Sequence, residues 1–121
     1  MTYTFIADIS EQVEIPDAGT LSRVLYRDDR LRVVAFAFDE GQELTEHTAA
    51  VPALVQVLSG TISVNLDGET IEMGPGAWLR MDAHLAHSLR AVEPSVVLLT
   101  LLPDATPLEL RHSSTPEGVS Q

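Results

Sequence analysis

Four histidines are the side chains in this sequence best suited to acid–base chemistry or metal binding: His47, His84, His87 and His112. An imidazole titrates near neutral pH and binds zinc, copper, iron or nickel through a ring nitrogen. The chain has no cysteine, which excludes disulfides, thiolate nucleophiles and cysteine-bound metals. All seven basic residues are arginine, and the lack of lysine excludes Schiff-base catalysis. Any reaction therefore depends on the histidines, on a metal that they bind, or on Asp82, Glu46, Tyr3 or Tyr26.

Short apolar stretches, separated by turns rich in glycine, proline and acidic residues, must position these side chains. We expect strands over residues 21–26, 31–38, 53–58, 61–66, 69–73, 77–81, 88–92 and 96–102. Residues 61–66 alternate between apolar and polar, and Asp67-Gly68 then predicts a two-residue hairpin turn. No stretch has a convincing amphipathic helical pattern. Short strands at regular spacing are typical of an all-β sandwich or barrel.

Glycine and histidine recur at fixed spacing in two segments, from Gly41 through His47 to Gly60, and from Gly76 to His87. The first segment resembles the first motif of the cupin family, G-x5-H-x-H-x3 or x4-E-x6-G. The second resembles the second cupin motif, G-x5-P-x-G-x2-H. The resemblance implies an all-β fold of the cupin type, a jelly-roll barrel or double-stranded β-helix, with residues 1–103 as a single domain.

The resemblance also implies where a metal would bind. Cupins usually hold a divalent metal with two histidines and a glutamate from the first motif and one histidine from the second. His47 and His87 match two of these positions, whereas Ala49 and Ala53 stand at the second histidine and the glutamate. Because a stable site generally needs three protein ligands, His84 is the candidate third ligand. The predicted cofactor is a divalent metal (zinc, nickel, iron or manganese), and the alternative is a metal-free pocket with two histidines as its polar groups.

Three further side chains are candidates for a ligand pocket: Gln56, Trp78 and Arg80. Strict alternation from an inward Ala53 turns Gln56 outward unless a bulge intervenes. Trp78 suits stacking on a substrate, although packing is the simpler interpretation. Arg80 suits binding of a carboxylate, although a structural pair with Asp82 is the simpler interpretation.

The charge of the chain limits its partners. Seven basic and eighteen acidic residues give a net charge of −11, which argues against nucleic acid and anionic membranes as partners. The first residues have no signal-peptide pattern, and no apolar run is long enough to span a membrane. We therefore expect a cytoplasmic protein that binds a small molecule.

The two ends of the chain and one strand bear on its assembly. Residues 104–121, which include His112, are expected to form a partly disordered tail. Residues 1–15 alternate weakly and suit an edge strand exchanged with a second subunit. Residues 31–38 carry apolar side chains on both faces, and one face needs a cover outside the barrel. These features predict a homodimer.

Several functions fit these observations. The leading hypothesis is a small-molecule-binding cupin whose site lies inside the barrel around His47 and His87. A metal-free ligand-binding or sensor protein is the alternative, since Ala49 and Ala53 enlarge the cavity and make it more apolar. A metal-dependent oxygenase or isomerase is another, and a barrel that acts only through dimerisation is the last. Since one fold supports many reactions, the fold class does not choose among them.

Overall fold

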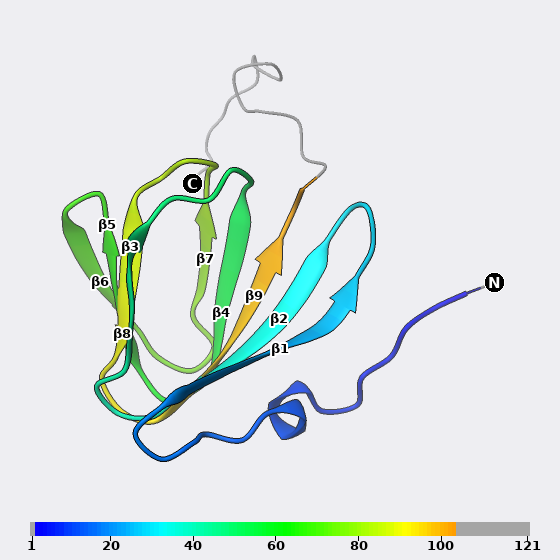
Figure 1. Ribbon diagram of the computed structural model, residues 1–121, viewed down its shortest axis with the longest axis horizontal. Coiled ribbons are helices and arrows are strands. Elements are labelled where there is room, and N and C mark those ends of the chain that lie inside the picture. Colours follow the sequence, from blue (N-terminus) through cyan, green and yellow to red (C-terminus); the bar gives the residue numbers. More distant parts are fainter. Residues whose placement is uncertain (1, 104–121) are drawn as a thin grey trace.

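Two antiparallel β-sheets make up the structure, a computed structural model that describes residues 2–103 (Figure 1). Within this range the chain forms nine strands and one short 3-10 helix, Ile9–Gln12. The strands are β1 (Thr20–Arg27), β2 (Arg32–Phe38), β3 (Glu43–His47), β4 (Ala53–Ser59), β5 (Ile62–Leu66), β6 (Glu69–Met73), β7 (Trp78–Met81), β8 (His87–Ala91) and β9 (Ser95–Leu101). The predicted all-β fold is confirmed. The predicted tail, residues 104–121 with His112, lies outside the described residues.

Strands that are distant in sequence lie next to one another in both sheets. The larger sheet has the order β1-β2-β9-β4-β7, and the smaller sheet has the order β3-β8-β5-β6. Every pair of neighbours is antiparallel. The chain crosses repeatedly from one sheet to the other, so that β9 lies between β2 and β4, and β8 lies between β3 and β5. This connectivity gives a jelly roll, with an apolar core between the facing sheets.

The core takes alternate side chains from each strand. On β4 the side chains of Ala53, Val55 and Val57 are buried, whereas Gln56 between them is exposed. On β5 the inward positions are Ile62 and Val64. This period of two is the one that an unbulged strand imposes, and it places the core between the sheets where the sequence pattern predicts it.

Strand β3 is absent from the predicted strands. Its five residues include one apolar side chain, Leu44, and the other four are exposed. It pairs only with β8, at the edge of the smaller sheet. An edge strand that faces water on most of its length has little hydrophobic alternation, so composition alone does not distinguish it from a polar turn.

Two turns need a left-handed backbone. Asp67 and Gly68 have φ of 52° and 92°, which are the angles of the predicted two-residue hairpin between β5 and β6. Gly60 has φ of 82° and lies against Pro94 and Ser95, where a Cβ atom would stand 2.2 Å from the Ser95 hydroxyl oxygen. Glycine at position 60 is therefore required both by its backbone angle and by the close approach of another segment.

The outer face of the larger sheet carries a second, smaller apolar cluster. Its buried members are Val13, Ala35, Ala37 and Val96. The segment before the 3-10 helix forms no strand and extends away from the barrel beside β1 (Figure 1). Within residues 2–103 no helix has the length and apolar character needed to cross a membrane.

Candidate functional site

His47 at the end of β3 and His87 at the start of β8 stand opposite each other in the smaller sheet. Their ring centroids are 4.3 Å apart and their planes meet at 60°, an edge-on arrangement. A β-bulge makes this possible: Leu44 pairs with Leu89 and His47 with His87, so β3 takes three residue steps where β8 takes two. Strict alternation would turn Leu44 and His47 to opposite faces, and the bulge instead brings both to the inner face.

The hydrogen bonds of the two imidazoles fix their tautomers. Nδ1 of His47 lies 2.8 Å from the carbonyl oxygen of Thr45, and Nδ1 of His87 lies 2.8 Å from that of Leu85. A carbonyl oxygen only accepts hydrogen bonds, so each Nδ1 carries the proton and donates it. In the neutral form each ring therefore has an unprotonated Nε2, which is free to accept a hydrogen bond or to bind a metal.

The two histidines lie at one end of a small apolar cavity between the sheets. Its volume is about 50 Å³. Besides the histidines its lining is apolar and consists of Phe36, Phe38, Leu44, Val55, Met81, Leu89, Val97 and Leu99. His87 is buried, with 9% of its surface exposed, and His47 is exposed. The cavity therefore reaches solvent beside His47 and has no other polar side chain in its lining.

His84 does not join the other two histidines. It lies on the loop between β7 and β8, its side chain is exposed, and its φ is 70°. Its backbone N–H donates to the carbonyl oxygen of Ala49 at 2.7 Å, which ties this loop to the loop after β3. His84 is absent from the lining of the cavity, so its position is that of a turn residue.

The remaining candidates lie on the other side of the larger sheet. Gln56 and Trp78 pair across β4 and β7, and both are exposed, Trp78 with 61% of its surface. Arg80 forms an ion pair with Asp82 on the same exposed edge. None of the three lines the cavity, because alternation along β4 and β7 turns them outward. The structure therefore does not bring them together with His47 and His87.

The donor set does not fit the divalent metals that the sequence predicts. Within residues 2–103 there is no group of three or more histidine, aspartate or glutamate side chains arranged to hold an ion. Ala49 and Ala53 stand where the family places ligands, and alanine has no donor atom. Two imidazoles are fewer than the three protein ligands that zinc, nickel, iron and manganese sites generally use.

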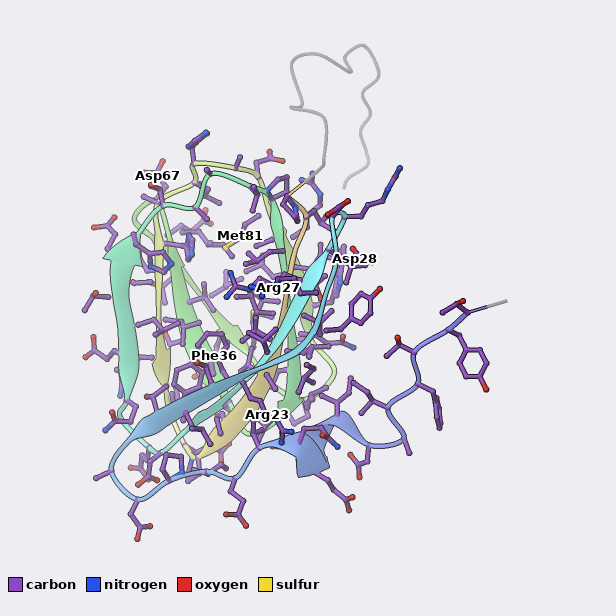
Figure 2. The ribbon with its side chains drawn as sticks, turned by 45° about the vertical axis from the view of Figure 1, so that its right-hand side comes forward. Arg23, Arg27, Asp28, Phe36, Asp67 and Met81 are labelled. Atoms are coloured by element: carbon purple, nitrogen blue, oxygen red, sulfur yellow. The ribbon has the colours of Figure 1, made fainter. Side chains whose placement is uncertain are left out.

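Met81 is a site residue that sequence analysis missed. It is the last residue of β7, it is buried, and it pairs in register with Ala53. Figure 2 shows Met81 pointing into the space between the sheets, at the end of the barrel where the Asp67 turn lies. A methionine in an apolar strand is typical of a buried core, so its sequence gives no sign of a site. Only the shared cavity connects Met81 with the histidines.

The perturbed pKa values lie away from this site, on turns of the larger sheet. Asp28 accepts a hydrogen bond from the Tyr26 hydroxyl and others from the N–H groups of Arg30 and Leu31. These bonds lower the pKa of Asp28, and the same contact raises the pKa of Tyr26. The pKa of Asp39 is lowered mainly by the N–H of Ala18, and these groups shape turns rather than the cavity.

Several solved structures have a fold similar to this one. No curated protein matches the chain. Among solved structures, a conserved protein of unknown function from Streptococcus pyogenes is 30% identical, with a TM-score of 0.77, over 88% of this chain and 93% of that one. KdgF from Halomonas sp. is 26% identical, with a TM-score of 0.73, over 86% of this chain and 96% of that one.

An RmlC-like cupin from Desulfovibrio desulfuricans is 27% identical, with a TM-score of 0.75, and the match covers 88% of this chain and all of that one. The family described as Cupin domain matches residues 34–117, which is more than half of the chain. The matched range contains β3 to β9, most of β2 and both facing histidines. The chain is therefore a member of the cupin family.

Proposed function

We propose that this cupin binds a small ligand inside the barrel, with His47 and His87 as the groups that hold its polar end. The observation that carries the proposal is the pair of facing imidazoles with fixed tautomers at the mouth of an otherwise apolar cavity. A few convergent polar groups in an apolar concave site are the usual composition of a ligand pocket.

The chemistry of the lining restricts the ligand. In the neutral form of the two rings the Nε2 atoms accept hydrogen bonds, so the complementary ligand presents a donor, such as a hydroxyl or an N–H group. The remaining lining offers only apolar contacts, which favours a hydrocarbon body. A cavity of about 50 Å³ holds only a few atoms, so the rest of the ligand extends toward the mouth beside His47.

Phenol and toluene test the proposal, because they differ in the donor and are otherwise similar in shape. We expect phenol to shift the ring NMR signals of His47 and His87 on titration and toluene to bind more weakly. The double variant His47→Ala/His87→Ala should remove the preference for phenol, whereas His84→Ala should keep it. Equal binding of phenol by the double variant and the wild type would overturn the proposal.

The divalent-metal site and the oxygenase or isomerase activity find less support. An oxygenase or isomerase reaction needs further reactive groups or a metal with open positions. The cavity lining contributes two imidazoles and no carboxylate. Ligand binding without a divalent metal is therefore the function that this lining favours.

We also propose that a second copy of the chain covers the outer face of the larger sheet. A groove of about 530 Å³ runs between this face and the leader, residues 2–15, and is lined by side chains that include Tyr3, Ile6, Val33 and Leu98. Tyr3 and Phe5 expose 80% and 77% of their surfaces. Exposed aromatic side chains beside an apolar sheet face are typical of an interface.

A further inference from the structure

Two arginines at one end of the larger sheet turn toward the barrel interior. Arg27, the last residue of β1, pairs in register with Arg32, the first residue of β2. Their neighbours Tyr26 and Val33 line the groove on the outer face, so alternation turns both arginines to the inner face. Figure 2 shows Arg27 extending from the end of β1 toward the smaller sheet. Both guanidinium groups therefore belong to the side of the sheet that encloses the cavity.

The arginines lie at the end of the barrel where the histidines lie. Side chains of β2 and β3 line the cavity together, so these two strands face each other across it. β2 runs away from Arg32, and after the short loop of residues 39–42 β3 returns toward His47. Arg32 and His47 therefore stand at the same end of two facing strands. Because facing sheets lie about 10 Å apart, a short molecule can reach from the imidazoles to the guanidinium groups.

The charges of these arginines are not neutralised by other described residues. Within residues 2–103 neither of them forms an ion pair, and the one that is formed there joins Arg80 to Asp82. The carboxylate that follows Arg27 in the chain, that of Asp28, accepts hydrogen bonds from the Tyr26 hydroxyl and from two backbone N–H groups of its own turn. Like charges at directly opposite positions of an antiparallel pair repel each other. A bound anion would remove this repulsion.

The guanidinium group determines which anion fits. Its planar fork of N–H donors matches a carboxylate with two parallel hydrogen bonds. Three of the seven basic residues of the chain lie within positions 27–32, so this turn is a local centre of positive charge on a chain with a net charge of −11. An organic acid is therefore attracted to this end of the barrel rather than to the acidic remainder of the surface.

We infer that Arg27 and Arg32 bind the carboxylate of a ligand whose other end is held by His47 and His87. The inference rests on the proposed function, and it names the ligand class as a short organic acid with a hydroxyl or N–H donor at its far end. The apolar lining of the cavity contacts the hydrocarbon between the two ends. Both arginines are exposed, so the carboxylate stays at the solvent-facing end and keeps part of its hydration.

Two probes that differ only in charge test the inference, para-hydroxyphenylpropionate and the corresponding amide. Both carry the phenol hydroxyl that the imidazoles accept, and only the acid has a carboxylate. We expect the wild type to bind the acid at least about fivefold more tightly than the amide, measured by NMR titration of the histidine ring signals. The preference should decrease as salt is added, because ions screen an exposed pair of charges.

Removal of the two guanidinium groups should abolish this preference. The double variant Arg27→Gln/Arg32→Gln should bind the acid and the amide equally, and it should fold, since both side chains are exposed. The matched control is Arg80→Gln/Arg90→Gln, which removes the same charge from exposed positions outside the cavity lining. The control should keep the preference for the acid.

Equal binding of acid and amide by the wild type would overturn the inference, and so would an unchanged preference in the double arginine variant. If the amide then still binds the wild type more tightly than His47→Ala/His87→Ala, the arginine site fails alone and the proposed function stands. If the loss of both histidines leaves amide binding unchanged, or if neither compound binds the wild type, the proposed function fails together with the inference.

Discussion

At the scale of single residues, the two backbone carbonyls that hold His47 and His87 decide what the pair can do. Each carbonyl lies two residues before its histidine and fixes the proton on Nδ1. Without these bonds a neutral ring would exchange between tautomers and present a donor to the cavity part of the time. The carbonyls of Thr45 and Leu85 therefore make the cavity end of both rings an acceptor.

Nitrogen NMR of the histidine rings tests this arrangement. In the neutral form of each ring, we expect Nδ1 of His47 and His87 to show the shift of a protonated nitrogen and Nε2 that of an unprotonated one. His84 makes no side-chain hydrogen bond within residues 2–103 and serves as the internal comparison. An Nε2–H tautomer at either His47 or His87 would contradict the structure.

Gly60 gives a prediction about stability. Gly60→Ala combines the cost of a left-handed angle with a Cβ atom 2.2 Å from the Ser95 hydroxyl oxygen and 2.3 Å from the Pro94 carbonyl oxygen. Gly76→Ala is the matched control, since Gly76 has φ of 89° and nothing within 4 Å of the added atom. We expect a loss of about 1–2 kcal/mol in unfolding free energy for the control. For Gly60→Ala we expect at least about 3 kcal/mol, measured by urea denaturation. Equal losses of unfolding free energy in the two variants would show that the close approach of Pro94 and Ser95 to position 60 adds no cost.

The same scale shows what sequence can and cannot predict about the site. His47 and His87 are found from their spacing to Gly41 and Gly76, because a motif anchored on turns survives partial loss of its ligands. Met81 is not found, since a methionine buried in the core and one that lines a cavity have the same pattern in one strand. Only the shared cavity shows that Met81 lies with the histidines.

At the scale of the elements, short apolar runs between turns predict eight of the strands and miss the one that carries His47. Residues 53–58 are apolar except for Gln56, and alternation from an inward Ala53 turns Gln56 outward, as it lies in β4. In β3 the pattern is hidden twice, first because Leu44 is its only apolar residue and then because a bulge changes the face of His47. A bulge depends on how the partner strand is registered, which a single segment does not encode.

Asp39 links the end of β2 to the segment before β1, and it predicts how stability varies with pH. Its carboxylate accepts from the N–H of Ala18 at 2.6 Å and from that of Glu40 at 2.8 Å, and these bonds lower its pKa. A carboxylate with a depressed pKa in the folded state stabilises the fold above its unfolded pKa of about 4. That contribution is lost as the pH falls through the lower folded pKa.

Asp39→Asn should therefore be less stable than wild type at pH 7, and the difference should shrink as the pH falls below about 4. Asp29→Asn is the control, because Asp29 lies in a nearby turn and its side chain makes no hydrogen bond within residues 2–103. Urea denaturation at several pH values between neutral and acid measures both variants. A constant difference across this range would mean that the ionised carboxylate of Asp39 contributes nothing.

At the scale of the whole molecule, the inner and outer faces of the larger sheet have different roles. The inner face helps to enclose the cavity and the histidines, and its partner is the smaller sheet. The outer face packs on Val13 near β1 and β9, but the groove between Leu98 and the leader stays open. The leader itself extends away from the barrel (Figure 1). Its aromatic side chains, Tyr3 and Phe5, are exposed. In a symmetric dimer, the leader of each copy could cover the open groove of the other, so that both exposed surfaces would be buried.

Sedimentation of the full chain at micromolar concentration tests this assembly. We expect a dimer for wild type, and a shift toward monomer for the double variant Tyr3→Ser/Phe5→Ser, because burying two aromatic side chains is a large share of a small interface. Both side chains are mostly exposed in the single chain, so their loss should leave the unfolding free energy of the monomer almost unchanged. The variant Trp78→Ser changes a residue on β7, at the opposite edge of the same sheet, and tests whether the interface extends that far. If it also weakens the dimer, the interface extends across β4 to β7; if it does not, the leader and β2 suffice. A wild type that sediments as a monomer would contradict the dimer, whatever the variants do.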